Sequence, residues 1–86
     1  MPEISRFFGI VIKMYFDEHN PPHFHAEYGE DEALININTM AVIAGELPSR
    51  ALGLVIEWAS INQDELRQEW ERARNMQSLG KISPLK

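Results

Sequence analysis

The spacing of apolar residues changes at Leu47-Pro48-Ser49, and this change constrains the fold of the 86-residue chain more than any other feature. Before it, apolar and polar residues alternate in short runs that are separated by turn residues. Such alternation is typical of strands, whose successive side chains point to opposite faces of a sheet. After it, apolar residues recur every three or four positions, as on a helix with one buried face. A chain of this length supports one modest core. We therefore predict one domain in which a sheet precedes helices.

Five runs in the N-terminal half have the composition of strands: residues 2–8, 10–16, 23–28, 33–39 and 41–44. Gly9, the segment Asp17 to Pro22 and the polar segment Gly29 to Glu32 separate them. The two prolines at 21 and 22 lack backbone N–H donors, so their segment cannot lie inside a central strand. Because the connections are short, we predict an antiparallel meander of four to five strands.

Apolar character in the first run, and alternation in the later runs, predict which side chains face the core. They are Ile4, Phe7, Phe8, Ile10, Ile12, Met14, Phe16, Phe24, Ala26, Tyr28, Ala33, Ile35 and Ile37. A register error of one residue would invert this assignment, because the side-chain period of a strand is two.

The C-terminal half predicts two helices. The first begins at Pro48 or Ser49 and has a broad apolar stripe. Asn62 has the character of an N-cap for a second helix over about 63–75, and Glu65 completes a pattern like a capping box. We predict an α+β fold in which both helices pack on one face of the sheet. Residues 1–76 form the domain and residues 77–86 a flexible tail.

All three histidines lie in the segment from His19 to His25. If the residues after Pro22 are extended, then His23, His25 and Glu27 share one face of a strand. Neighbouring strands are expected to add polar side chains to the same open face of the sheet. The predicted binding patch consists of Lys13, His19, His23, His25, Glu27, Asn36 and Asn38.

A His-x-His pair on a strand presents two imidazoles on one side, which suits a divalent transition metal. Glu27 and His19 are the candidates for further ligands beside His23 and His25. This donor set does not choose among zinc, iron, nickel and copper. Two other interpretations of the histidines stay open. In the first, their role is structural. In the second they are catalytic, and either a bound metal does the chemistry or His19 or His23 acts as a general base.

The net charge of −5 is unevenly distributed. No lysine or arginine occurs between residues 14 and 49, whereas seven acidic residues do. This field repels phosphate backbones, so nucleic-acid binding by the protein alone is not expected. The chain lacks cysteine, a secretory signal pattern and any apolar run of the roughly 20 residues that cross a bilayer. We expect a cytoplasmic protein that does not enter a membrane, and a homo-oligomer is compatible with the sequence.

Three motifs resemble the small bacterial family called domain of unknown function 4160. They are Met1-Pro2-x-Ile4-Ser5-Arg6-Phe7, Pro21-Pro22-His23-Phe24-His25-Ala26-x-Tyr28-Gly29, and Gly45-x-Leu47-Pro48 followed by Glu57-Trp58. The resemblance covers nearly the whole chain, and Pro-Pro-His-x-His is its most specific part. It carries no established activity. Its members are often encoded beside a small protein of domain of unknown function 2442, which implies a two-component module of toxin–antitoxin type.

Two functions follow as expectations. The first is a binding or regulatory module that works with a small protein partner encoded nearby. The alternative is a small metal-dependent hydrolase or nuclease that uses the same histidines, whose acidic surroundings would require a metal or a basic partner.

Overall fold

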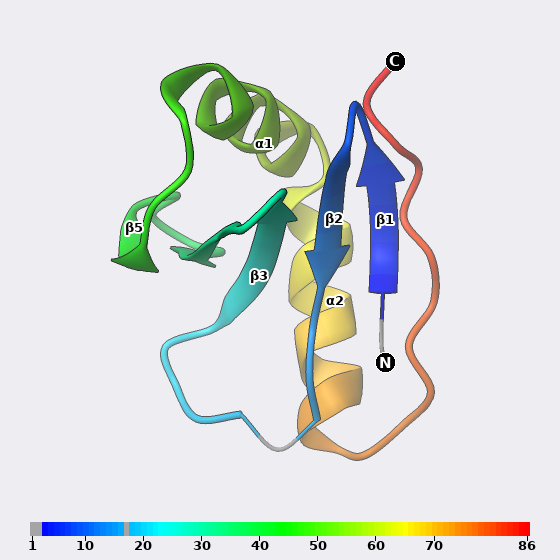
Figure 1. Ribbon diagram of the computed structural model, residues 1–86. Helices are drawn as coiled ribbons and strands as arrows, with labels where there is room; N and C mark the ends of the chain where they lie inside the picture. The colour runs from blue at the N-terminus through cyan, green and yellow to red at the C-terminus, as the bar shows by residue number, and fades with distance from the viewer. Residues whose placement is uncertain (1–2, 17) are drawn as a thin grey trace.

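The chain folds into one antiparallel sheet followed by two helices (Figure 1), in a computed structural model that describes residues 3–16 and 18–86. The strands, in both chain and sheet order, are β1 (Glu3–Phe7), β2 (Ile10–Lys13), β3 (His23–Tyr28), β4 (Asp31–Asn36) and β5 (Val42–Gly45). The helices are α1 (Ser49–Ile61) and α2 (Gln63–Arg74). The predicted α+β class and meander order are confirmed. Pro2 and Asp17, which the prediction placed in a strand and a turn, lie outside the described residues.

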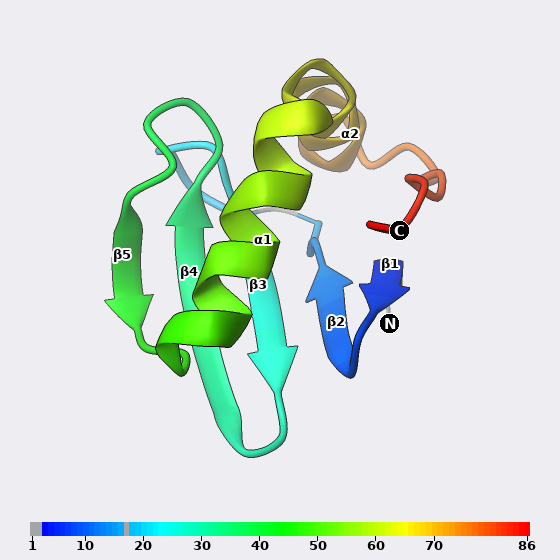
Figure 2. The same ribbon diagram turned by 90° about the horizontal axis from the view of Figure 1, so that it is seen from above.

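Each strand pairs with its neighbours in the chain, and the helices cover one face of this sheet. In the centre, Ala26 of β3 lies opposite both Ile12 of β2 and Ala33 of β4. Figure 2 shows α1 crossing over β3 and β4, with α2 continuing beyond one end of the strands. The opposite face of β3 is therefore free of helix α1, and it carries the histidines.

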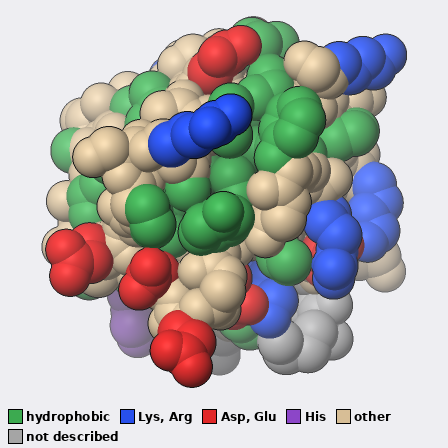
Figure 3. Space-filling view, turned by 45° about the horizontal axis from the view of Figure 1, so that its top comes forward, with side chains coloured by type: hydrophobic (Ala, Val, Ile, Leu, Met, Phe, Trp, Pro, Cys, Tyr) green, Lys and Arg blue, Asp and Glu red, His purple; other side chains and the backbone are tan. Residues whose placement is uncertain are grey.

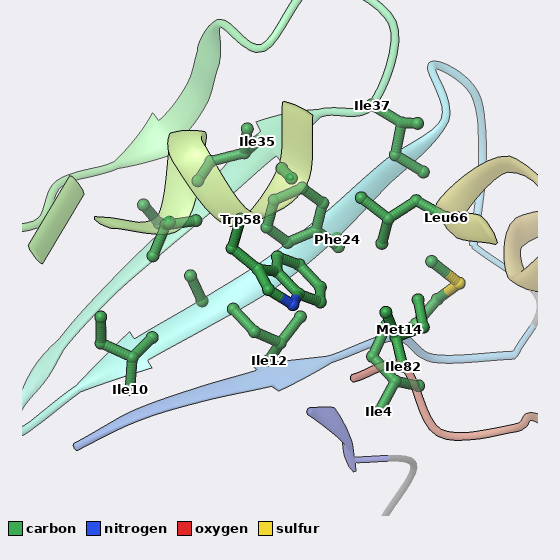
Figure 4. Packing of buried hydrophobic residues seen from close by; sticks show 14 of the residues in the cluster. Ile4, Ile10, Ile12, Met14, Phe24, Ile35, Ile37, Trp58, Leu66 and Ile82 are labelled. Atoms are coloured by element: carbon green, nitrogen blue, oxygen red, sulfur yellow. The ribbon is translucent and has the colours of Figure 1, made fainter. Parts of the chain in front are cut away.

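The core lies between the sheet and the helices, and Trp58 of α1 is at its centre (Figure 4). The ring of Phe24 meets the Trp58 ring edge-on, with centroids 5.9 Å apart, and Phe7 lies 5.4 Å from the same ring. Most of the apolar positions predicted from alternation are buried: Ile4, Phe7, Ile10, Ile12, Met14, Phe24, Ala26, Ala33, Ile35 and Ile37. The predicted strand register is thus confirmed for the central strands.

Three aromatic side chains that were predicted to be buried are exposed instead. Phe8 lies in the turn between β1 and β2 and is 59% exposed. Phe16 lies beyond the last residue of β2, and Tyr28 is the last residue of β3, next to the turn into β4. The prediction was wrong at Phe16 and Tyr28 because alternation continues in the sequence past the point where the helices cover the strands. It was wrong at Phe8 because this residue lies in the turn and not in the strand.

Asn62 also departs from its predicted role. Its side-chain Nδ2–H donates a hydrogen bond to the Trp58 carbonyl at 2.9 Å, and no side-chain bond caps α2. The residue therefore closes the end of α1, and the expected capping box with Glu65 is absent from this junction. The acids in the first turn of α2 and the arginines in its last turn do match the helix dipole.

The segment after α2 runs back along β1 (Figure 1). The Ile82 N–H donates to the Ile4 carbonyl at 2.8 Å, and the Trp58 indole N–H donates to the Ser83 carbonyl at 2.8 Å. The buried Glu69 accepts a hydrogen bond from the Gly80 N–H at 2.8 Å. The sequence predicts that residues 77–86 form a flexible tail, and this stays a prediction. These contacts lead us to propose that the segment is held on the domain and shields the edge of β1.

Replacing Ile82 with alanine is expected to lower the free energy of unfolding by about 2–4 kcal/mol, because the side chain is 3% exposed and its removal leaves a cavity. Ile61→Ala is the matched control, since Ile61 is 69% exposed. Urea denaturation of both variants measures the difference. If Ile82→Ala and Ile61→Ala lower the free energy of unfolding equally, residues 77–86 do not contribute to the folded domain.

Candidate metal centre

Three side chains converge beside the start of β3: Glu18, His23 and His25. The histidines project from the face of β3 opposite Phe24, and the connection from β2 to β3 brings Glu18 against them. Glu18 Oε1 lies 2.5 Å from His25 Nε2 and 3.4 Å from His23 Nε2. One potential ligand atom from each of the three residues lies within 4.8 Å of the other two. We call these three residues the His–Glu trio.

One ring nitrogen of His23 has a hydrogen-bond partner, and the other has none among the described residues. Its Nδ1 lies 2.8 Å from the Pro21 carbonyl, which only accepts hydrogen bonds, so Nδ1 carries a proton. Its Nε2 is buried and has no hydrogen-bond partner among the described residues. The ring lies against the Trp70 ring of α2 at a centroid distance of 5.2 Å, and the residue is 6% exposed. The prediction of an open position for His23 was therefore wrong, because α2 reaches past the end of the sheet.

Both ring nitrogens of His25 face carboxylates. Nε2 faces Glu18, and Nδ1 lies 3.2 Å from Glu32 Oε2 on β4. The Tyr15 ring meets the imidazole edge-on at 4.6 Å. With a proton on Nδ1 donated to Glu32, Nε2 is left as a ligand atom within 4.8 Å of those of His23 and Glu18.

This arrangement has the donor set of a metal centre. Two imidazoles and one carboxylate bind zinc in hydrolytic enzymes and iron in facial triads, and leave further positions for water or another ligand. Metal-bound histidines usually donate their second N–H to a carbonyl or a carboxylate, and here the Pro21 carbonyl and the Glu32 carboxylate lie beside Nδ1 of His23 and of His25. Metal–ligand bonds of about 2.0–2.1 Å place tetrahedral ligand atoms about 3.3 Å apart. The 3.4 Å pair already has this spacing, and the 2.5 Å pair needs to widen by less than an ångström.

Two other residues predicted as metal ligands lie elsewhere. Glu27 Oε1 accepts a bond from Lys13 Nζ at 3.0 Å, and this hydrogen bond raises the pKa of Lys13. The Glu27 carboxylate is thus paired with Lys13 of β2. His19 is exposed and lines a polar hollow of about 280 Å³ next to the trio, with Glu18, Asn20 and Arg74.

The two asparagines of the predicted patch serve the turn after β4. Asn36 Oδ1 accepts from the N–H groups of Asn38 and Thr39 at 2.7 and 3.0 Å. Asn38 Oδ1 accepts from Arg67 Nε of α2 at 3.0 Å. Asn36 is the β4 partner of His23, so it lies next to the trio, but its side-chain oxygen is engaged by the turn. The side chain of Asn38 is engaged by α2.

Comparison with known proteins identifies the family. The family model described as Domain of unknown function (DUF4160) matches residues 9–71. The chain belongs to this family. The matched range includes the whole trio and most of both helices. No curated protein and no solved structure matches the chain. Over residues 3–16 and 18–86, the structure contains no helix with the length and apolar content needed to cross a membrane.

Glu18 is the residue that sequence reasoning missed in this DUF4160 protein. It is one of the seven acidic residues between positions 14 and 49, but alternation along a strand says nothing about a side chain in a loop. A usable signal was present, since a loop that joins β2 to β3 must return to the first residue of β3, where His23 lies. Acids in such a loop are natural partners for a histidine at that end.

Proposed function

We propose that this protein is a small module that binds a divalent transition-metal ion through Glu18, His23 and His25. The observation that carries the proposal is the Nε2 atom of His23. It is buried, it lies 3.4 Å from Glu18 Oε1, and it has no hydrogen-bond partner in the part of the chain that the structure describes. A buried acceptor without a partner costs about 1–3 kcal/mol. A cation between His23, His25 and Glu18 satisfies all three acceptors together.

A simpler arrangement explains part of this geometry. A protonated His25 between Glu18 and Glu32 forms two charge-assisted hydrogen bonds and needs no metal. It leaves His23 unexplained, because the 3.4 Å separation from Glu18 exceeds the usual N–H···O range of about 2.7–3.2 Å. The acidic field of the N-terminal half further favours a cation at this place.

Metal-assisted hydrolysis is a second candidate function, supported by one observation. The polar hollow lined by His19, Asn20 and Arg74 adjoins Glu18 and offers room for a substrate beside the ion. A three-ligand ion with an open position activates water for attack. The net charge of −5 argues against a nuclease that acts alone.

Action with a protein partner, in a cytoplasmic two-component module, also remains a proposal. Its support is the family resemblance together with β5, an edge strand on which Val42 and Ile43 are 39% and 44% exposed. Exposed apolar edge strands are sites at which another chain adds a strand.

Calorimetric titration with Zn²⁺ tests the proposed metal site. Wild-type protein is expected to bind one equivalent, and Glu18→Gln to bind it about 10- to 100-fold more weakly, because a neutral amide replaces the ligand carboxylate. Glu27→Gln removes the same charge from β3 and is expected to leave the affinity unchanged. His19→Gln controls for the exposed histidine. The assignment is contradicted if Glu18→Gln leaves the zinc affinity unchanged. It is also contradicted if Glu27→Gln or His19→Gln weakens zinc binding as strongly as Glu18→Gln does.

A further inference from the structure

A second hollow, of about 370 Å³, lies at the opposite end of β3 from His23, among the β1–β2 turn, the last residue of β3 and the start of α1. Its main lining residues are Phe8, Ile10, Tyr28, Arg50, Ala51 and Leu54. Its volume falls in the range of roughly 300–1,000 Å³ that is usual for small-molecule sites. None of the lining residues belongs to the His–Glu trio. Among the residues that line it, only Tyr28 and Arg50 have polar side-chain groups.

The aromatic side of this hollow is set by the two-residue turn between β1 and β2. Phe8 has a φ of +49° and Gly9 a φ of +80°. Positive φ at both central positions is what a type I′ hairpin turn requires, so this conformation belongs to the hairpin. The conformation leaves Phe8 59% exposed beside Tyr28, which is 40% exposed. Figure 3 shows hydrophobic side chains gathered around a basic side chain on the face formed by α1 and the β1–β2 turn.

Arg50 is the charged group of this hollow, and its charge is uncompensated. Each of the other four arginines lies within 4.0 Å of an acid: Arg6 of Glu3, Arg67 of Asp64, Arg72 of Glu69 and Arg74 of Glu71. Arg50 has no such partner in the part of the chain that the structure describes. The first turn of α1 also contains no acidic residue, so the positive end of the helix dipole adds to the same field.

We infer that this hollow binds a small hydrophobic carboxylate. The aryl or alkyl body would lie against Phe8, Tyr28 and Leu54, and the carboxylate would accept hydrogen bonds from the Arg50 guanidinium. A guanidinium presents paired N–H donors that match the two oxygens of a carboxylate. The inference is independent of the proposed metal site.

An NMR titration of the ¹⁵N-labelled protein tests this inference. The probe is 4-phenylbutyrate, and its neutral primary amide, 4-phenylbutyramide, is the matched ligand control. Saturable shifts are expected at Gly9, Arg50 and Ala51. The acid is expected to bind about tenfold more tightly than the amide, which is the size of one charge-assisted hydrogen bond. Arg50→Gln is expected to remove this preference, and Arg6→Gln, which deletes an arginine outside the hollow, to keep it.

The apolar wall gives a second test. Phe8→Ser is expected to weaken the acid and the amide equally, because it removes apolar contact and leaves Arg50 in place. Equal affinities for acid and amide in the wild-type protein would overturn the inference. So would shifts confined to other regions, or no saturable shift up to about 10 mM probe.

Discussion

Replacing Phe24 with alanine is expected to lower the free energy of unfolding by about 3–5 kcal/mol. The side chain is fully buried between the sheet and α1, and its ring packs edge-on against Trp58. Truncation removes this contact and leaves a cavity that the neighbouring strands cannot fill without moving. Guanidinium or urea denaturation of the purified variant measures the loss.

Phe8→Ala is the matched control for this change. Phe8 is 59% exposed, so the same truncation is expected to cost no more than about 0.5 kcal/mol. Similar losses for the two variants would mean that Phe24 does not face the core. The register of β3 would then be wrong by one residue. His23 and His25 would not lie on the face that points away from the core.

Zinc is expected to stabilise the folded protein by about 2.7 kcal/mol when the free ion is present at 100 times its dissociation constant. The ion binds the folded trio, and the unfolded chain does not hold the three ligands together. The His23→Ala/His25→Ala double variant is expected to show no stabilisation. Denaturation with and without zinc gives the difference for each protein, and the His19→Gln variant, which keeps the trio, is expected to behave as wild type.

The comparison must be made within each variant. His23 packs against Trp70 and is 6% exposed, so the double variant is expected to be less stable than wild type even without zinc. This corrects the expectation that both histidines stand on an open face. Equal stabilisation of wild type and double variant would place the ion elsewhere, and no stabilisation of wild type would argue against a metal-binding fold.

The sheet and its register were predictable because they depend on local patterns. Ile10, Ile12 and Met14 occupy every second position of one run, and the same period of two places Phe24 and Ala26 in the core. The pattern failed where burial depends on distant elements. Tyr28 continues the apolar set of β3, but at the end of that strand, beside the start of α1, it is left 40% exposed.

The candidate site was half predictable for the same reason. His23 and His25 share a face of β3 because a strand has a period of two. Glu27 shares that face as well, yet β2 places Lys13 beside it and engages its carboxylate. Glu18 takes the position beside the histidines through the path of a loop, and that path depends on tertiary packing.

The most direct test of the central claim is the anomalous scattering of crystals grown with one equivalent of Zn²⁺. We expect one peak within about 2.3 Å of His23 Nε2, His25 Nε2 and a Glu18 oxygen. Nδ1 of His23 is expected to stay bonded to the Pro21 carbonyl, and Nδ1 of His25 to Glu32. A peak held by other residues, or no peak at full zinc concentration, would contradict the assignment of this trio as a metal centre.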